Sequence, residues 1–350
     1  MRILFIDLGS AWGGAERYLA SLMDAARSQG EWVACASPHY QHRKHANMHT
    51  EIPISYGTFP DIVRTICAIC HDKAIGLIHL NAARASYLAP LLRPLGIPIV
   101  ATRHSLSQAS TGGQVRQWTN RWLSSVCYRA AHKVICVSDS VRSELPARIG
   151  HKAVVIENGV TGPDAVKFDL PPHGTLGYVG RLVADKGILD FLSMARQFAE
   201  REPRASTRFV IAGTGPEATA VEKFALHTPS LSYLGFCSQL EEVYPSLSAL
   251  VLPSRAEGMP LAVLEAFSHG RAAIGYDVPG IRDVIDHGQT GYLVPLESGV
   301  DGLVAAADTL LKDPDNLLRM MHNARATYER RFRLDLMVDR TLELFREAAR

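Results

Sequence analysis

The sequence predicts two doubly wound α/β domains in tandem, followed by a helical tail. Short apolar runs alternate with helical patterns, and this alternation stops at a stretch rich in proline and glycine before it starts again. The last fifty residues contain helical patterns without strands between them. Continuous apolar strands are typical of a parallel sheet that helices cover on both faces. A length of 350 residues fits this organisation, because domains average about 150 residues.

The first domain is expected over residues 1–165, where each strand is a run of aliphatic and β-branched residues. Its strands are expected at Arg2–Leu8, Trp32–Ser37, Leu77–Leu80, Ile97–Ala101, Lys133–Val137 and Val154–Ile156. The helices between them are expected at Ala15–Arg27, Ala82–Leu92, Val115–Ala131 and Ser138–Leu145. The stretch from Thr161 to Gly174 is interpreted as a linker, because proline and glycine interrupt regular structure.

The second domain is expected over residues 166–328, followed by a final helix over residues 329–350 that could pack back on the first domain. The strands of the second domain are expected at Leu176–Val179, Phe209–Ala212, Leu231–Leu234, Leu250–Leu252 and Ala272–Gly275. The tail predicts helices at Gly299–Leu311, Asn316–Arg331 and Leu334–Arg350. Open α/β sheets bind ligands at the carboxyl ends of their strands, so functional residues are expected directly after strands, in a cleft between the domains.

Composition excludes several classes of protein. Hydrophobic residues make up 47% and charged residues 21% of the chain, which argues against disorder. No apolar run approaches the roughly 20 residues that cross a bilayer, and the segment Met1–Asp7 is too short and too soon acidic for a signal peptide. The six cysteines lie mostly in apolar runs, as in a reducing compartment. These observations predict a cytoplasmic globular protein.

Charge is unevenly distributed along the chain. Residues 1–165 hold 17 Lys and Arg against 11 Asp and Glu, whereas the remainder holds 20 against 24. A basic first half suits an anionic partner, such as a membrane surface or a phosphorylated acceptor, although ordinary scatter in surface charge explains it equally well. The histidine cluster His39, His42, His45 and His49 is interpreted as a basic loop facing such a partner or simply solvent, because no acid or cysteine completes a metal shell. The basic residues are dispersed, which argues against a nucleic-acid partner.

Two cations follow the first strand of the second domain, in the segment from Gly177 through Gly180 and Arg181 to Lys186. The glycines allow a ligand to approach the backbone closely. An arginine can bind phosphate oxygens in a bidentate manner, and a lysine adds a point charge. The segment therefore predicts an anion site, with a solvated turn as the alternative.

A second candidate segment, Glu257-Gly258-Met259-Pro260-Leu261, follows the strand at Leu250–Leu252. Pro260 suits the first turn of a helix, so the amides around it are free to bind an anion or a sugar hydroxyl. Glu265 lies inside an apolar helical run and is not expected to face the core without a partner. Its carboxylate suits two adjacent hydroxyls, such as a ribose diol. The alternative is a pair of acids that interact only with solvent and the helix dipole.

The first domain contributes two weaker signals. Gly13-Gly14-Ala15-Glu16 follows the first strand and opens a helix, an arrangement that suits phosphate binding but also a simple tight turn. His104 comes directly after the strand at Ile97–Ala101, where a ligand-binding role competes with a structural one.

Taken together, these segments resemble the retaining GT-B glycosyltransferases of family four, which use nucleotide-sugar donors. The matching pieces, in the order of that family, are Gly13-Gly14-x-Glu16, Thr102-x-His104, Glu157-Asn158-Gly159-Val160, Gly180-Arg181 with Lys186-Gly187, Ala212-Gly213-x-Gly215-Pro216, Glu257-Gly258-x-Pro260 with Glu265, Gly280, and Thr290-Gly291-x-Leu293-Val294. The sequence departs from the pattern at Ser105, where an acid is common, and at Arg271, near a position where proline often stands.

The resemblance implies a GT-B fold, a transition state like an oxocarbenium ion, and no dedicated metal. It implies that Arg181 and Lys186 stabilise the departing diphosphate, that Glu257 contacts the donor sugar, and that His104 lies near the reacting carbon. The residues that it implies for donor binding are Gly13, Gly14, Asn158, Gly180, Gly215, Gly258, Met259, Pro260, Leu261 and Glu265, the last through the ribose.

Other motifs are interpreted as structural. The turn Gly213-Thr214-Gly215 is close to a dinucleotide fingerprint, but the acid that should follow the next strand is missing from Tyr233–Phe236. Of the acids around Pro314, Asp315 is expected to cap a helix rather than bind a metal. The pair Cys67-x-x-Cys70 lies in an apolar-periodic stretch and predicts no metal or redox role.

The resemblance therefore implies a metal-independent retaining hexosyltransferase without a cofactor. Its substrates would be a UDP- or GDP-sugar and a glycan or lipid-linked acceptor, in the synthesis of a cell-envelope polysaccharide, lipopolysaccharide or glycolipid. The enzyme would be cytoplasmic and peripheral on the inner face of the membrane. The alternatives are a sugar-nucleotide binding protein without turnover and an NAD-dependent oxidoreductase.

Overall fold

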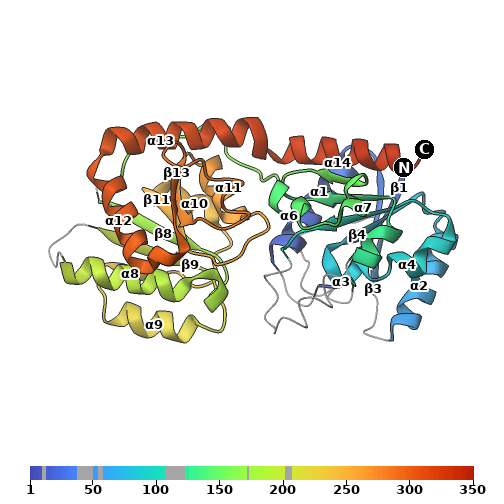
Figure 1. Ribbon diagram of the computed structural model, residues 1–350, viewed down its shortest axis with the longest axis horizontal. Coiled ribbons are helices and arrows are strands. Elements are labelled where there is room, and N and C mark those ends of the chain that lie inside the picture. The colour runs from blue at the N-terminus through green and yellow to red at the C-terminus, as the bar shows by residue number, and fades with distance from the viewer. Residues whose placement is uncertain are drawn as a thin grey trace. The chain divides into compact units, whose positions relative to one another are not determined.

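The computed structural model describes residues 1–9, 13–37, 50–53, 58–106, 123, 125–171, 173–201 and 207–350. It consists of two compact units (Figure 1). The first unit combines Met1–Gly159 with Leu334–Arg350, and the second is formed by Val160–Arg333. Each unit is an α/β body built on one parallel sheet, so the predicted fold class is confirmed.

The first unit contains a seven-stranded parallel sheet in the order β3-β2-β1-β4-β5-β6-β7. Its strands are β1 (Arg2–Asp7), β2 (Trp32–Ser37), β3 (Thr50–Pro53), β4 (Leu77–Asn81), β5 (Ile99–Arg103), β6 (Lys133–Cys136) and β7 (Ala153–Val155). All six strands predicted for this domain are present within two residues of their predicted bounds. The edge strand β3 was not predicted, because its sequence Thr-Glu-Ile-Pro lacks an apolar run.

The helices of the first unit are α1 (Gly14–Ser28), α2 (Phe59–Asp72), α3 (Ala82–Ser86), α4 (Ala89–Leu92), α6 (Asp139–Ser143), α7 (Ala147–Gly150) and α14 (Leu334–Ala348). The single helix predicted over Ala82–Leu92 is wrong, because two short helices replace it and Pro90 lies in the first turn of the second. Of the helix predicted over Val115–Ala131, residues 123 and 125–130 are helical, and residues 115–122 and 124 lie outside the described residues. Burial raises the pKa of the Cys70 thiol in α2 to about 12, which fits a structural cysteine.

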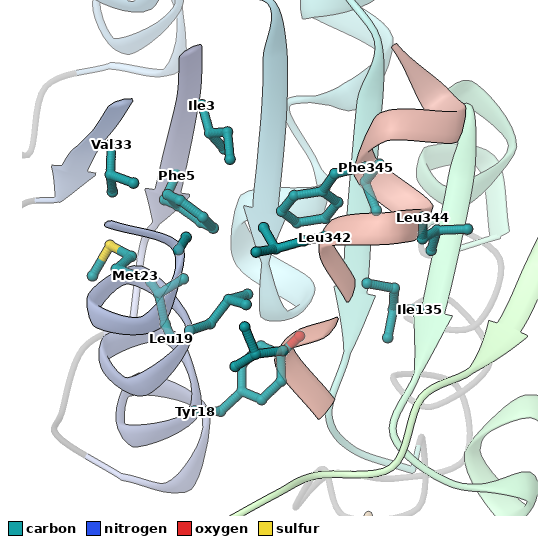
Figure 2. Packing of buried hydrophobic residues seen from close by; sticks show 14 of the residues in the cluster. Ile3, Phe5, Tyr18, Leu19, Met23, Val33, Ile135, Leu342, Leu344 and Phe345 are labelled. Carbon is teal, nitrogen blue, oxygen red and sulfur yellow. The ribbon is translucent and has the colours of Figure 1, made fainter. Parts of the chain in front are cut away.

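The core of the first unit is completed by the end of the chain. Met337, Val338, Leu342, Leu344 and Phe345 of α14 join one buried cluster with residues of α1 and strands β1, β2, β4, β5 and β6. Figure 2 shows Phe345 and Leu342 beside Phe5 of β1, and the rings of Phe5 and Phe345 are 6.2 Å apart. Each such side chain contributes roughly 1.5–3 kcal/mol when fully buried, so α14 is an integral part of this unit.

The second unit contains a six-stranded parallel sheet in the order β10-β9-β8-β11-β12-β13. Its strands are β8 (Thr175–Val179), β9 (Arg208–Ala212), β10 (Leu231–Tyr233), β11 (Ala249–Leu252), β12 (Ala272–Tyr276) and β13 (Gly291–Val294). Its helices are α8 (Ile188–Arg201), α9 (Ala218–Leu226), α10 (Leu240–Val243), α11 (Leu261–Ser268), α12 (Gly299–Lys312) and α13 (Pro314–Thr327) (Figure 1). A π-helical turn at Tyr328–Phe332 follows α13. The predicted strands are present, and β13 is an additional edge strand.

The predicted linker is packed against the second unit. Arg271 is almost fully buried and donates hydrogen bonds to the carbonyl oxygens of Lys167 and Asp169, at 3.3 and 3.2 Å. Phe168 stacks on His322 of α13, with ring centroids 3.8 Å apart. These contacts give a structural reason for an arginine at position 271, where the sequence departs from the family pattern.

Helix α13 is capped by an acid that precedes Pro314. The expectation that Asp315 caps a helix is wrong, because the side chain of Asp313 accepts the hydrogen bond from the amide of Asn316 at the start of α13. Asp315 instead lies in the first helical turn.

None of the helices in the described part of the chain has the length and hydropathy that a membrane span requires.

Candidate functional site

The loops that follow β8 and β9 meet at the carboxyl edge of the second sheet. The amide of Gly180 donates to the carbonyl oxygen of Ala212 at 3.0 Å, and the amide of Leu182 donates to that of Thr214 at 2.9 Å. Because all strands are parallel, the loop after β11 leaves the sheet at this same edge. The two segments that the sequence singled out in this unit therefore begin at one edge.

Gly213 is required for this packing of backbone on backbone. Its φ is +147°, and a Cβ atom added there would lie 1.8 Å from the carbonyl oxygen of Gly180. A Cβ atom on Gly215 would lie 2.4 Å from the carbonyl oxygen of Leu182. The predicted donor-binding residues Gly180 and Gly215 thus belong to one tightly packed pair of loops.

Lys186 and Glu257, both predicted as catalytic, form an ion pair in the structure. Their Nζ and Oε1 atoms are 2.6 Å apart, and the two side chains are 32% and 10% exposed. The backbone explains how they meet: Gly187, with φ +74°, packs so closely that a Cβ atom would lie 1.9 Å from the carbonyl oxygen of Pro253. The ion pair keeps two opposite charges partly shielded from water at the edge of the sheet.

Arg181 differs from Lys186 because its side chain is exposed. Its carbonyl oxygen accepts a hydrogen bond of 2.8 Å from the hydroxyl group of Tyr178. Burial raises the pKa of Tyr178, and the charge of Glu257 raises it further while that of Arg181 lowers it. Within the described ranges, no acidic group pairs with the Arg181 guanidinium. The site therefore offers one cation held by a carboxylate and one that is open to a ligand.

Two residues that the sequence analysis missed support the loop that carries Glu257. The Oδ2 atom of Asp190, on α8, accepts hydrogen bonds from the hydroxyl group of Tyr276 at 2.9 Å and from Nη2 of Arg255 at 3.0 Å. The amide of Arg255 also donates to the carbonyl oxygen of Asp185 at 3.0 Å. No motif connects Asp190 with Arg255, so only the fold reveals this support.

Helix α11 begins directly after the loop that contains Glu257. Gly258, Met259 and Pro260 are buried, and Leu261 at the start of the helix is partly exposed. The first amides of a helix have no partner within that helix and suit an anion or a hydroxyl group. Glu265, one turn into α11, is buried and accepts a hydrogen bond of 2.7 Å from the hydroxyl group of Tyr244. The expectation that this carboxylate does not face the core unpaired is confirmed.

The remaining predicted residues lie in the first unit. Gly13 and Gly14 are at the start of α1, and Asn158 is buried near the end of the unit. His104, directly after β5, hydrogen-bonds through Nε2 to Oδ1 of Asn81 at 2.8 Å. Burial lowers the pKa of His104 to about 3, so its ring is neutral at physiological pH. This edge of the first sheet therefore presents an uncharged imidazole.

The structure thus brings the predicted residues together in two groups, one in each unit. The group in the second unit contains Gly180, Arg181, Lys186, Gly215, Glu257, Gly258, Met259, Pro260, Leu261 and Glu265. In the first unit, the start of α1 and His104 are linked through Asn81. Among the described residues, no three His, Cys, Asp or Glu side chains are grouped as a metal site would require. The histidine cluster at residues 39–49 lies outside the described residues.

Comparisons with known proteins agree with this arrangement. A family model described as glycosyltransferase family 4 matches residues 12–161, and one described as glycosyl transferases group 1 matches residues 173–313. The alpha-D-kanosaminyltransferase of Streptomyces kanamyceticus is 29% identical over 77% of this chain and 76% of that protein. An Escherichia coli UDP-Gal:alpha-D-GlcNAc-diphosphoundecaprenol alpha-1,3-galactosyltransferase is 27% identical over 77% of this chain and 74% of that protein.

Comparison with a solved structure identifies the fold. The crystal structure of Anabaena HepE in complex with UDP-glucose aligns with a TM-score of 0.82, over 99% of this chain and 100% of that chain, at 17% identity. The fold is therefore that of the GT-B glycosyltransferases. Because the two family models match most of the chain, one in each unit and in the expected order, the protein belongs to the family 4, group 1 glycosyltransferases.

Proposed function

We propose that this glycosyltransferase transfers a sugar from a nucleoside diphosphate donor with retention of configuration and without a metal ion. The observation that carries the proposal is the presence of two cations after β8, at one edge of the second sheet. Lys186 forms an ion pair with Glu257, and the side chain of Arg181 is exposed to solvent. Two further facts support it: one relative is named for a UDP-galactose donor, and HepE was solved with UDP-glucose.

The donor would be held by the second unit. Its diphosphate would interact with Arg181, Lys186 and the first amides of α11, and its ribose diol would interact with Glu265. Glu257, released from Lys186 as the phosphate arrives, would accept hydrogen bonds from hydroxyl groups of the sugar. The tight loops at Gly180 and Gly215 would let the nucleotide approach the backbone. Each role follows from the charge and hydrogen-bonding capacity of the side chain.

The reaction breaks the bond between the anomeric carbon and the phosphate oxygen, and the electron pair stays on the departing diphosphate. An acceptor hydroxyl forms the new bond on the same face of the sugar, and its proton passes to the departing phosphate oxygen. Fixed cations stabilise the growing negative charge more strongly than they stabilise the bound donor, so they lower the barrier. Lys186 and Arg181 would supply the positive charge that a divalent metal supplies in other phosphate-transfer sites. Retention is supported by the relatives, both of which are named for α products.

The first unit would bind the acceptor. Its neutral His104 suits hydroxyl groups rather than phosphates, and its excess of basic residues suits an acceptor that carries phosphate at a distance from the reacting hydroxyl. The E. coli relative is named for a diphosphoundecaprenol-linked acceptor. By analogy, the acceptor would be a glycan or a lipid-linked glycan in the synthesis of a cell-envelope polysaccharide, lipopolysaccharide or glycolipid. A lipid-linked acceptor would place the enzyme peripherally on the inner, anionic face of the membrane.

A thermal-shift panel of UDP-, GDP-, TDP- and ADP-sugars tests the donor. A donor at about 100 times its Kd adds about 2.7 kcal/mol of stability, which is readily seen as a higher Tm. The stabilising donor is then incubated with candidate acceptors, and NMR of the product reports the anomeric configuration. We expect one nucleotide to stabilise the protein, slow donor hydrolysis without acceptor, and a retained anomer. Binding without transfer or hydrolysis would leave only a sugar-nucleotide binding protein, and stabilisation by NAD alone would refute the proposal.

A further inference from the structure

Asn81 connects three elements at the carboxyl edge of the first sheet. It is the last residue of β4, is fully buried, and pairs in register with Asp7 of β1 and Thr102 of β5. Its Nδ2 atom donates to the carbonyl oxygen of Ala15 in the first turn of α1, at 3.2 Å. Its Oδ1 atom lies 2.8 Å from Nε2 of His104. Both polar atoms of the amide are therefore used.

These two contacts determine which ring nitrogen of His104 carries the proton. The carbonyl oxygen of Ala15 can only accept, so the amide nitrogen of Asn81 must face it and Oδ1 must face the histidine. Oδ1 can also only accept, so Nε2 of His104 must be the donor. In a neutral imidazole the other nitrogen is then unprotonated. Nδ1 is the acceptor atom of the ring, and among the described residues no group donates to it.

A strained residue follows Asn81 directly. Ala82 has a φ of +64°, in the left-handed region that residues with a Cβ atom seldom occupy. At this residue the chain changes from β4 to α3. Strained backbone of this kind persists where the surrounding structure holds it, often beside functional side chains. The turn at Ala82 lets the strand end abruptly with Asn81 between Asp7 and Thr102.

We propose that Asn81 is a positioning residue, which holds the His104 ring with Nε2–H donated to its amide oxygen so that Nδ1 accepts a hydrogen bond from a substrate hydroxyl. The inference rests on the proposed function, because the hydroxyl belongs to the sugar or the acceptor. In the described part of the chain, the titratable groups that lie against His104 are Tyr18 of α1, whose ring lies edge-on at 4.7 Å, and His79 of β4. Burial keeps the hydroxyl group of Tyr18 and the ring of His79 uncharged near neutral pH, so neither supplies a charge that competes with Asn81.

The tautomer can be measured without any substrate. Ring 15N NMR of the histidine-labelled protein, with His104 assigned through a His104→Gln variant, should show a protonated Nε2 and an unprotonated Nδ1. In Asn81→Ala the two shifts should move toward those of a mixture of tautomers. A wild-type spectrum with the proton on Nδ1, or one that is unchanged in Asn81→Ala, would overturn the proposal. Since no donor is needed, this result stands even if the proposed transfer reaction is not found.

A double-mutant cycle tests whether Asn81 acts through His104. Asn81→Ala should lower kcat by roughly tenfold or more, and adding it to His104→Ala should lower kcat by less than about twofold further. Losses that multiply in the double variant would show that Asn81 acts independently of His104 and would overturn the proposal. Ala82→Gly serves as the control, since glycine relieves the left-handed strain and should keep both kcat and the 15N shifts.

Asn81→Asp gives a third readout and covers the case in which Asn81→Ala does not fold. A carboxylate beside Nε2 raises the pKa of a histidine, so below the raised pKa the ring becomes doubly protonated and Nδ1 can no longer accept. The variant should therefore lose activity toward acid pH and regain it toward alkaline pH, whereas the wild type lacks this limb. A pH profile identical to that of the wild type would contradict the proposed role.

Discussion

The two sheets present different chemistry at equivalent edges. In the first unit, uncharged side chains of β4 and β5 and of the residue after β5 hold one another: Asn81 binds His104, and His79 binds Thr102 at 2.7 Å. In the second unit, the corresponding loops carry charges, with Lys186 on Glu257 and Arg255 on Asp190. Uncharged side chains such as His104 suit hydroxyl groups, whereas cations such as Lys186 suit a diphosphate. The same α/β architecture occurs twice in the chain, and under the proposed function one copy binds the acceptor while the other binds the donor.

The two edges also differ in how they are built. The loops of the second unit are fixed by backbone packed against backbone, with no room for a side chain at Gly213. The edge of the first unit is fixed by buried polar side chains, including two histidines whose pKa values burial lowers to about 3. A substitution that adds a Cβ atom to these loops should therefore destabilise the second unit, whereas a lower pH should destabilise the first unit. Single substitutions can test this difference.

Gly213→Ala should have the largest effect. The new Cβ atom would lie 1.8 Å from the carbonyl oxygen of Gly180, so the two loops must separate or strain. We expect the second unit to lose about 3 kcal/mol or more of unfolding free energy, measured by urea denaturation. Gly150→Ala is the matched control, because a Cβ atom at Gly150 meets nothing within 4 Å. Equal stability of the two variants would show that the loops are not packed as described.

His79→Gln should change the response of the first unit to acid. Burial lowers the pKa of His79 from 6.5 to about 3, so between these values the unfolded chain binds a proton that the folded chain does not. Stability is therefore lost as the pH falls below about 6.5, by roughly 3 kcal/mol at about pH 4.5 from this group alone. His79→Gln should flatten that dependence in urea titrations at several pH values. The exposed control His151→Gln should keep the wild-type slope, and an unchanged slope in His79→Gln would contradict the assignment.

Glu257→Gln should separate nucleotide binding from transfer. In the free protein Glu257 holds Lys186 at 2.6 Å, and the amide would release that cation for phosphate. We expect UDP, or whichever nucleoside diphosphate the protein binds, to bind up to about tenfold more tightly by calorimetry, while transfer falls. The exposed Glu297→Gln is the control. Weaker binding of the diphosphate in Glu257→Gln would show that the ion pair does not compete with the ligand.

Much of the fold follows from the sequence, because a doubly covered parallel sheet needs continuous apolar strands. The strands that were missed, β3 and β13, are edge strands with short or interrupted apolar runs. The helix predicted over Ala82–Leu92 was wrong because the helix breaks between Ser86 and Ala89, before Pro90, and helical periodicity does not report this break.

Less of the site could be predicted. The motif residues Arg181, Lys186 and Glu257 were found because each follows a strand in a recognisable segment. The supporting partners of other residues at the two sheet edges come from distant parts of the chain: Asn81 on β4 for His104, Tyr244 for Glu265, and Asp190 on α8 for Arg255. None of these partners carries a local signal, since a buried asparagine or tyrosine looks like any other until the fold brings its partner within 3 Å.

The most direct test of the account is the effect of Lys186→Ala on binding and on turnover, measured separately. If Lys186 takes up charge as the sugar–phosphate bond breaks, kcat should fall by roughly a hundredfold, about 3 kcal/mol, while the Kd of the nucleotide sugar rises only a few-fold. The exposed Lys223→Ala should match the wild type in both. A Lys186→Ala enzyme with the wild-type kcat, or one whose entire loss lies in Kd, would contradict the central claim.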